Sequence, residues 1–470
     1  DILSFAPHLL DSIPVTLPRE TRITLASNVH GTVNDLTIEK LSVKTLASTS
    51  LALTGNVKNV TDADNMKLRM QLKKFVTTTK DLRSVLRDSL LPESVQLPDS
   101  ISLAGSYTGL LKAPAVDLQL TTSSGNASAH GKFDFRSTPS YNVAVETKQL
   151  NVGRILKQPE TLGVLDMKAT AKGTGIEVND IRANVDILVS RFQYSKYDYR
   201  DFKIKGSLNK YLFSGEAALH DENLDFTVTG DLDYTGNVPT YKLTVNLVNA
   251  DFQKLNLSER PLKARGGVKV DLATSDFRVI NGDLAIYKVG IYNGESLYMV
   301  DSLLFASIDQ DGKSSMTIRS EILSGKFEGT FNIFTIGTVM KQHVNRYFSL
   351  HDESVKEFAS PQNFKFDLTI RDTDLITEIL VPELEPFVPG VIKGEFDSEE
   401  NRLDLEIALS KITYATTSFD SVSVDVESDD EELSYRVRLK NILLDTLTID
   451  AMQLTGKVEN DSIYSALQIL

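Results

Sequence analysis

The histidines are the first side chains to consider for chemistry, because imidazole acts as a general base and as a metal ligand. They are His8, His30, His130, His220, His343 and His351. No two of them have the i, i+2 or i, i+4 spacing that presents a pair of ligands from one strand or helix. We therefore expect solvated histidines at strand ends or turns, a packing role for His343 beside a helical apolar stripe, and no metal or cofactor.

Three short motifs resemble ligand loops but are incomplete. The stretch from Lys172 to Val178 begins like a dinucleotide loop but lacks its third glycine and a following helix, which favours a glycine-rich hairpin turn. Asp309 to Gly312 begins like a calcium loop but lacks the terminal glutamate, which favours a hairpin tip. Asp425 to Glu432 is an acidic run, typical of a solvated turn. With no cysteine and no Gly-x-Ser-x-Gly elbow, the sequence predicts no catalytic residue and no enzyme.

One aromatic group allows two interpretations. Its members are Phe192, Tyr194, Tyr197, Tyr199 and Phe202. The spacing changes phase between Tyr194 and Tyr197, as a turn or bulge requires. Aromatic packing across strands is the ordinary interpretation, and an aromatic rim on an apolar cleft is the functional one.

The elements that must position any site are strands. Apolar and polar residues alternate along most of the chain, which is the pattern of strands with one buried face. The clearest apolar sets lie within residues 51–57, 116–120, 224–234, 241–247, 364–370, 403–409, 422–426 and 433–439. Turn signals between them, including Asn281-Gly282 and Asn293-Gly294, predict a long succession of antiparallel hairpins, some thirty strands in all.

Helical periodicity is confined to three short stretches. The first comprises Leu82, Val85, Leu86 and Leu90; the second Ile336, Val339, Met340, Val344 and Tyr347; the third Leu375, Ile376, Ile379 and Leu380. None is long enough to cover the apolar face of so large a sheet. A degenerate repeat of a helix or turn followed by strands starts near residues 81, 150, 252 and 374, and no low-complexity linker interrupts it. We expect residues 1–470 to form one continuous segment.

Composition narrows the partners. The chain carries 50 Lys and Arg against 64 Asp and Glu, a net charge of -14, which disfavours nucleic acid because phosphate binding needs a basic surface. No apolar run approaches the roughly 20 residues that span a bilayer. The abrupt start at Asp1 and the abrupt end at Leu470 favour a piece of a longer chain over a mature processed protein.

An apolar face without a helical cover must be covered in another way. The sheet either curls into an apolar-lined groove or divides into sandwiches whose two sheets cover each other. The absent linkers and recurrent short helices favour the first, so the expected fold is all-β: a long antiparallel repetitive sheet curled into an apolar-lined groove, with a few short helices. The expected lipid-binding lining includes Leu118, Val143, Phe226, Leu243, Val245, Phe366, Leu405 and Val437.

The strand phrases resemble those of the TamB family of bacterial envelope proteins, within the AsmA-like group of bridge-like lipid transfer proteins. Residues 51–57 read LALTGNV, residues 226–232 read FTVTGDL, and residues 241–252 read YKLTVNLVNADF. A fourth phrase, FDLTI at residues 366–370, leads to Leu375 and Pro382. The resemblance covers essentially the whole chain, in the style of a Bacteroidota-like member.

The resemblance implies a periplasmic β-groove in the envelope of a Gram-negative bacterium. It also implies an N-terminal inner-membrane anchor and a C-terminal region that engages an Omp85-type outer-membrane protein similar to TamA. Neither the anchor nor the partner-binding region is recognisable in this sequence, which is what a middle portion would show. The implied activity is movement of phospholipid between the inner and outer membranes.

Three functions follow as hypotheses. The first is a hydrophobic conduit that holds acyl chains on the apolar face with headgroups at the open edge. The second is a chaperone-like scaffold for outer-membrane protein assembly that offers strand edges to incoming strands. The third is a purely structural envelope protein or adhesin built from closed sandwiches.

Overall fold

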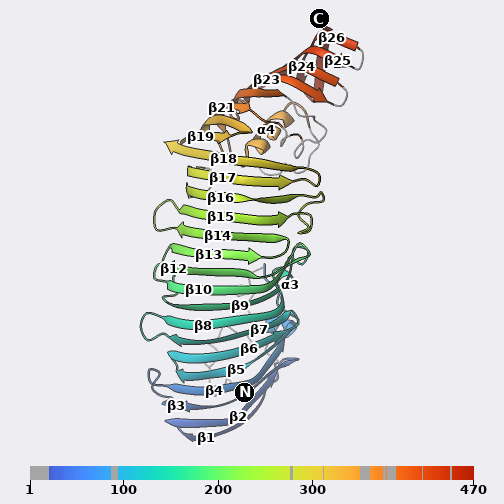
Figure 1. Cartoon of the computed structure of the whole chain (residues 1–470). Coiled ribbons are helices and arrows are strands. Elements are labelled where there is room, and N and C mark those ends of the chain that lie inside the picture. The colour runs from blue at the N-terminus through green and yellow to red at the C-terminus, as the bar shows by residue number, and fades with distance from the viewer. Residues whose placement is uncertain are drawn as a thin grey trace. The chain divides into compact units, whose positions relative to one another are not determined.

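The computed structural model describes residues 21–85, 94–275, 279–310, 312–349, 360–373, 377, 388–414, 417–444 and 447–470. The chain is all-β, as the sequence predicts: its 27 strands belong to a single antiparallel sheet that is not closed into a barrel, with few short helices (Figure 1). Because all of these strands belong to one sheet, the alternative of stacked sandwiches is wrong. The chain divides into two compact units, residues 1–229 with 254–259 and residues 230–253 with 260–470.

In the first unit, neighbouring strands along the chain pair in antiparallel fashion, and β10 pairs with β9, β11 and β12. The strands are β1 (Thr24–Thr32), β2 (Asp35–Thr45), β3 (Thr49–Lys58), β4 (Lys67–Thr78), β5 (Ser100–Leu110), β6 (Ala113–Thr122), β7 (Gly125–Asp134), β8 (Ser140–Asn151), β9 (Leu162–Thr174), β10 (Arg182–Tyr194), β11 (Tyr197–Tyr199), β12 (Phe202–Asn209) and β13 (Leu212–His220). β14 (Leu224–Asp233) spans the boundary between the units.

In the second unit, each strand again pairs with the next. The strands are β15 (Thr240–Asp251), β16 (Lys263–Ala273), β17 (Asn281–Tyr292), β18 (Leu297–Gln310), β19 (Lys313–Ser320), β20 (Leu323–Thr330), β21 (Asn363–Ile370), β22 (Val388–Asp397), β23 (Arg402–Tyr414), β24 (Thr417–Ser428), β25 (Leu433–Leu444), β26 (Leu447–Glu459) and β27 (Ser462–Ile469). The Asn281-Gly282 turn signal is wrong: Asn281 pairs with Ala273 as the first residue of β17.

Strand alternation divides the sheet into an apolar and a charged face. The charged face carries ion pairs between neighbouring strands, such as Lys365 with Glu395 at 2.8 Å and Lys393 with Asp367 at 3.2 Å. These side chains are largely solvent-exposed, and exposed pairs of this kind stabilise a protein by at most about 1 kcal/mol. Their value here is diagnostic, since they identify the face that meets water.

β-Bulges keep the apolar residues on one face where strict alternation breaks. In β4 the pairing register with β5 shifts between Leu72 and Phe75. Lys73 and Lys74 are the two residues between them, and both are exposed. A bulge adds one residue to a strand, so Leu72 and Phe75 both remain half-buried on the same side. The sequence signal for the bulge is a pair of lysines that interrupts the alternation.

Short helices follow two strands of the first unit. α2 (Thr79–Val85) follows β4, and α3 (Val152–Ile155) follows β8. The side chain of Asn151 accepts a hydrogen bond from the Arg154 backbone N–H at 2.9 Å and so caps α3. Consecutive turns follow β15 at residues 252–256. No helix of the described ranges is long and apolar enough to cross a membrane.

The described residues test the three predicted helices to different extents. α4 (Ile336–Asn345) confirms the helix expected from the stripe that begins at Ile336. Leu86 and Leu90 of the first predicted helix lie outside the described residues. So do all four predicted positions of the third, Leu375, Ile376, Ile379 and Leu380. The repeat start near residue 374 lies outside them as well.

Candidate apolar binding face

Register places one apolar row across the second unit. Residues directly opposite each other in an antiparallel pair project to the same face, so successive pairs trace a line across the sheet. From β15 to β27 this line, which we name the C-terminal row, runs through Leu243, Val270, Leu284, Phe305, Ile318, Gly325, Leu368, Ile392, Ile407, Val424, Val437, Leu454 and Leu467. Every position of this row is apolar or glycine.

Five predicted lining residues come together on this face. Leu243 and Val437 are members of the C-terminal row. Val245 lies two residues from Leu243 along β15, so it shares the face. Phe366 pairs with Gly394, which in turn pairs with Leu405, and these positions form a parallel line two residues away from the row. All five predicted side chains are half-buried.

The first unit has a matching line, which we name the N-terminal row. From β2 to β13 it runs through Leu41, Leu53, Leu72, Gly105, Leu118, Ala129, Val145, Ala169, Ile187, Ile204 and Ala217. The predicted lining residue Leu118 belongs to it, and Val143 lies two residues from Val145 on the same face. Alanine and glycine alternate with larger residues here, so the side chains leave more room than in the C-terminal row.

Phe226 differs from the other predicted residues because it packs against a buried cluster. That cluster comprises Tyr199, Leu219 and Leu255, with Phe226 among the half-buried residues around it. Its ring centroid lies 6.2 Å from that of Phe202. Phe202 is two residues from Ile204 of the N-terminal row, so Phe226 contacts the apolar face. We therefore assign it a structural contact in addition to its predicted place in the lining.

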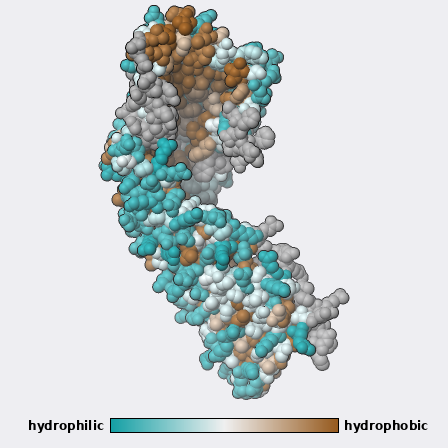
Figure 2. Space-filling model, turned by 90° about the vertical axis from the view of Figure 1, so that its right-hand side faces the viewer, coloured by the Kyte–Doolittle hydropathy of each residue, from teal (hydrophilic) through white to brown (hydrophobic). Residues whose placement is uncertain are grey.

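Most of the apolar face is half-buried in the part of the chain that the structure describes. Within the described residues, buried apolar side chains gather in two clusters, while the rows themselves are largely half-buried. Exposure is high in β27, whose residues are exposed on both faces, with Leu467 58% and Ile469 67% exposed. Figure 2 shows apolar residues lining a hollow in this part of the chain, with hydrophilic residues beside it. Water against such a surface costs roughly 25 cal/mol per Å².

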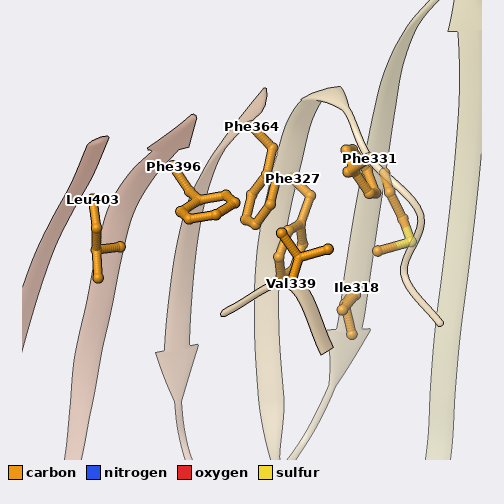
Figure 3. Packing of buried hydrophobic residues seen from close by; sticks show 8 residues of the cluster. Ile318, Phe327, Phe331, Val339, Phe364, Phe396 and Leu403 are labelled. Atoms are coloured by element: carbon orange, nitrogen blue, oxygen red, sulfur yellow. The ribbon is translucent and has the colours of Figure 1, made fainter. Parts of the chain in front are cut away.

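A stretch of the face in the second unit is covered by a helix, and the sequence did not predict this cover. α4 packs on β19 to β23 through Val339, which is 4% exposed. The cluster beneath it contains Met316, Ile318, Phe327, Phe331, Phe364, Phe396 and Leu403. Figure 3 shows Val339 beside the rings of Phe327, Phe364 and Phe396, which project from neighbouring strands. The helical stripe at Ile336 and Val339 predicts the helix from the sequence. It does not predict which strands the helix covers.

The C-terminal end of α4 is held by polar contacts. His343 is buried, and its Nε2 lies 2.8 Å from the Ser428 hydroxyl oxygen. Its ring packs edge-on against Phe396, with centroids 5.2 Å apart. Burial, with the charge of Arg346 as the second cause, lowers the pKa of His343 to about 4. Tyr347 donates a hydrogen bond to the Asp429 carbonyl oxygen and lies 3.3 Å from that of Asn401.

The structure places several other residues that the sequence singled out. His343 is the packing residue expected, but His130 lies within β7 instead of at a turn. His8 and His351 lie outside the described residues. Gly175 closes the β9–β10 connection with a φ of 72°, and Gln310 pairs with Lys313 at the β18–β19 hairpin tip. No group of three or more potential metal-ligating side chains occurs in the described part of the chain.

The acidic run contains the turn that was expected. Residues 429–432 connect β24 to β25, and the Asp429 carboxylate accepts hydrogen bonds from the backbone N–H groups of Glu431 and Glu432 at 2.8 and 3.0 Å. The bond from Glu432 and then that from Glu431 lower the pKa of Asp429. The carboxylate therefore organises its own turn.

The aromatic group packs across a hairpin. Phe192 pairs with Tyr199 and Tyr194 with Tyr197, and the phase change between them is the turn at Ser195 and Lys196. Burial raises the pKa of Tyr197 to about 12, with a hydrogen bond to Asp221 as the next cause. Cross-strand packing, the ordinary interpretation, is confirmed for these pairs.

Comparison of the chain with protein-family models, with curated proteins and with solved structures finds no match.

Proposed function

We propose that the apolar face binds acyl chains and that the protein is a hydrophobic conduit, carrying phospholipid between the inner and outer membranes through the periplasm. The observation that carries this proposal is the C-terminal row, in which every position from Leu243 to Leu467 is apolar or glycine. A face built only for folding would be covered by a second layer along its length. Among the described residues, α4 covers one stretch of this row, and the half-buried remainder can take an acyl chain as its occupant.

The length of the row matches a lipid path better than a single binding pocket. Its 13 strands are separated by twelve steps of about 4.8 Å, which gives roughly 58 Å along the sheet. Acyl chains are flexible and need no directional contacts, so they can cover such a surface at any point along it. Each buried methylene group contributes about 0.8 kcal/mol.

The other parts of the proposal rest on charge and on the family resemblance. The opposite face bears ion pairs such as Lys393 with Asp367, which keep it in water and leave the apolar face for the ligand. Headgroups would project from the open edge of the sheet. The strand phrases similar to TamB support the periplasmic location, the inner-membrane anchor and the outer-membrane partner.

Photocrosslinking of the purified chain tests the proposal. A diazirine fatty acid should crosslink to peptides that contain Leu243 and Val437, and organic extracts should contain phospholipid by mass spectrometry. A cysteine at Leu243 should react with an apolar maleimide that the fatty acid blocks, whereas a cysteine at Lys242 should react unblocked. Equal blocking at both positions would contradict the proposal. Binding of strand peptides without lipid would favour the scaffold for outer-membrane protein assembly instead.

A further inference from the structure

α4 interrupts the open part of the apolar face. Ile318 of the C-terminal row belongs to the cluster under α4, and Phe366 and Leu405 pack against that cluster. The helix therefore lies where an acyl chain following the row would have to pass. It brings aliphatic groups from Ile336, Val339 and Met340 to this surface.

The surface beneath α4 is rich in aromatic rings. Phe364 and Phe396 are 1% and 0% exposed, and Phe327 lies 5.6 Å from Phe366, centroid to centroid, in a stacked arrangement. Flat rings side by side form a floor that accepts any aliphatic chain laid across it, because dispersion contacts do not depend on the order of the carbons. The contact that α4 makes with this floor is thus one that methylene groups can replace.

We propose that α4 covers a cryptic acyl-binding site on Phe327, Phe364, Phe396 and Leu403, and that an acyl chain displaces the helix from it. The inference rests on the proposed binding of acyl chains by the uncovered face. It adds a second, closed site with its own aromatic floor and an intrachain occupant that competes with the lipid.

The hydrogen bond between His343 and Ser428 can break without leaving the Ser428 hydroxyl unsatisfied. The Ser428 hydroxyl has partners besides His343: it accepts a hydrogen bond from the Leu403 N–H at 2.9 Å and donates one to the Asn401 carbonyl at 3.2 Å. When His343 leaves, Ser428 stays satisfied, and the imidazole gains water. An unsatisfied buried polar group costs about 1–3 kcal/mol, and release of this contact incurs no such cost at Ser428.

The ends of the helix keep it attached to the sheet. Before α4, Gln362 donates a hydrogen bond from Nε2 to the Thr335 hydroxyl at 2.8 Å and accepts one from the Asn332 N–H at 3.2 Å. After α4, Tyr347 donates to the Asp429 carbonyl. The apolar middle of the helix can therefore lift while both ends remain tied to β21–β25 and their connections.

Val339→Asp tests the inference by placing a charge at the centre of the contact. Thr338→Asp is the matched control, because it adds the same charge to the same turn at a half-buried residue outside the cluster. The chain has no cysteine, so Leu403→Cys gives a single thiol under the helix. We expect Val339→Asp to speed maleimide labelling of that thiol at least tenfold and Thr338→Asp less than twofold. Equal rates in both variants would overturn the inference.

A diazirine fatty acid then locates the ligand. In the unaltered chain it should crosslink near Leu243 and, to a smaller extent, in peptides containing Phe364 and Leu403, and the Val339→Asp variant should increase the crosslinks in those two peptides. Crosslinks near Leu243 alone in both proteins would overturn the cryptic site and leave the proposed function intact. Crosslinks in neither place would overturn both.

Hydrogen exchange of the unaltered chain provides a check that needs no variant. The fatty acid should accelerate amide exchange in residues 336–345 while exchange in β15–β17 stays the same or slows. Slower exchange in the helix would mean that α4 is a wall of the site and not its competitor, and would overturn the inference.

Discussion

Phe364 of β21 and Phe396 of β22 pair directly across the sheet, with ring centroids 5.5 Å apart and exposures of 1% and 0%. Leu243, on the same face six strands earlier in the chain than β21, is half-buried. One face of one sheet is therefore a packed core in one stretch and a half-buried surface in another. The difference is α4, which supplies the second layer that a packed core requires.

This contrast predicts unequal costs for truncating side chains on the same face. Phe396→Ala should lower the free energy of unfolding by about 3–5 kcal/mol, because it empties a fully buried site. Leu243→Ala should cost less than about 1.5 kcal/mol, because that side chain is already half in solvent. Urea denaturation followed by circular dichroism measures both. Similar losses would show that Leu243 is covered by a layer that the described residues do not include.

The buried imidazole predicts a pH dependence. When α4 is undocked, His343 binds a proton near pH 6.5; when α4 is docked, His343 binds one only near pH 4. The undocked state therefore binds more protons between these two pH values. The docked state is therefore fully stable above pH 6.5 and loses stability as the pH falls towards 4. The groups around it are Arg346 on α4 itself, Ser428 on β24, the ring of Phe396 on β22, and Asp429 and Asp430 beyond Tyr347.

His343→Phe should remove this dependence, since Ser428 keeps its other partners. Between pH 7.5 and pH 5, the unaltered chain should lose on the order of 2 kcal/mol more than the variant in the unfolding transition that includes α4. His220→Phe is the control, because His220 is exposed and pairs with Asp225 at 2.9 Å. A His343→Phe variant with the pH profile of the unaltered chain would refute the assignment.

Alternation predicted the strands well because it is a local signal. The runs at residues 403–409 and 433–439 fall within β23 and β25, and the helical stripe at Ile336 became α4. The Asn281-Gly282 signal failed because the tertiary pairing of Asn281 with Ala273 extends β17 through it. The turn propensity of a dipeptide does not show which residue of the adjacent strand will pair with it.

The register and the cover of the face could not be predicted from the sequence. Leu243 and Val437 were both expected in the lining, but only the chain of cross-strand pairs shows that they share one row. Val339 and Phe396 are 57 positions apart, and no periodicity links a helix to the strands beneath it. The alternation fixes which residues face the same way; long-range pairing decides which of them meet.

A buried carboxylate predicts a structural role in the first unit. Asp81 is 4% exposed and accepts hydrogen bonds from the Ser48 N–H at 2.7 Å and the Thr49 hydroxyl at 2.8 Å. Burial raises its pKa, but these and further backbone bonds outweigh burial and lower it. Asp81→Ala should cost about 1–3 kcal/mol of unfolding free energy, because it leaves donors of the β2–β3 turn without their acceptor.

The matched control is Asp117→Ala, at an exposed site on β6, where the change should stay within about 0.5 kcal/mol. The stability that depends on ionised Asp81 should be present above pH 3.8 and disappear as the pH falls below that value. A loss for Asp81→Ala no larger than for Asp117→Ala would show that the turn holds without the carboxylate.

The sharpest prediction concerns charge on the open part of the face. Leu243→Asp with Val245→Asp places two carboxylates on adjacent positions of one face of β15. Backbone pairing of β15 with β16 does not depend on these side chains, and both are half-buried and outside the two buried clusters of the described residues, so the sheet should persist by circular dichroism. Acyl chains cannot solvate ions, and an unpaired charge in an apolar setting costs several kcal/mol. Recovery of phospholipid and crosslinking of the diazirine fatty acid near β15 should therefore fall at least tenfold.

The control places the same two charges on the other face, as Lys242→Asp with Thr244→Asp. Both of these side chains are exposed, so lipid recovery should stay within twofold of the unaltered chain. Unfolding of the Leu243 and Val245 variant would mean that a closed core lies over β15, and the face could not bind lipid there. A folded variant that retains its lipid would place the ligand elsewhere. The proposal requires that the Leu243 and Val245 variant folds and loses its lipid, and that the control variant keeps its lipid. This result would show that acyl chains bind the apolar face at β15.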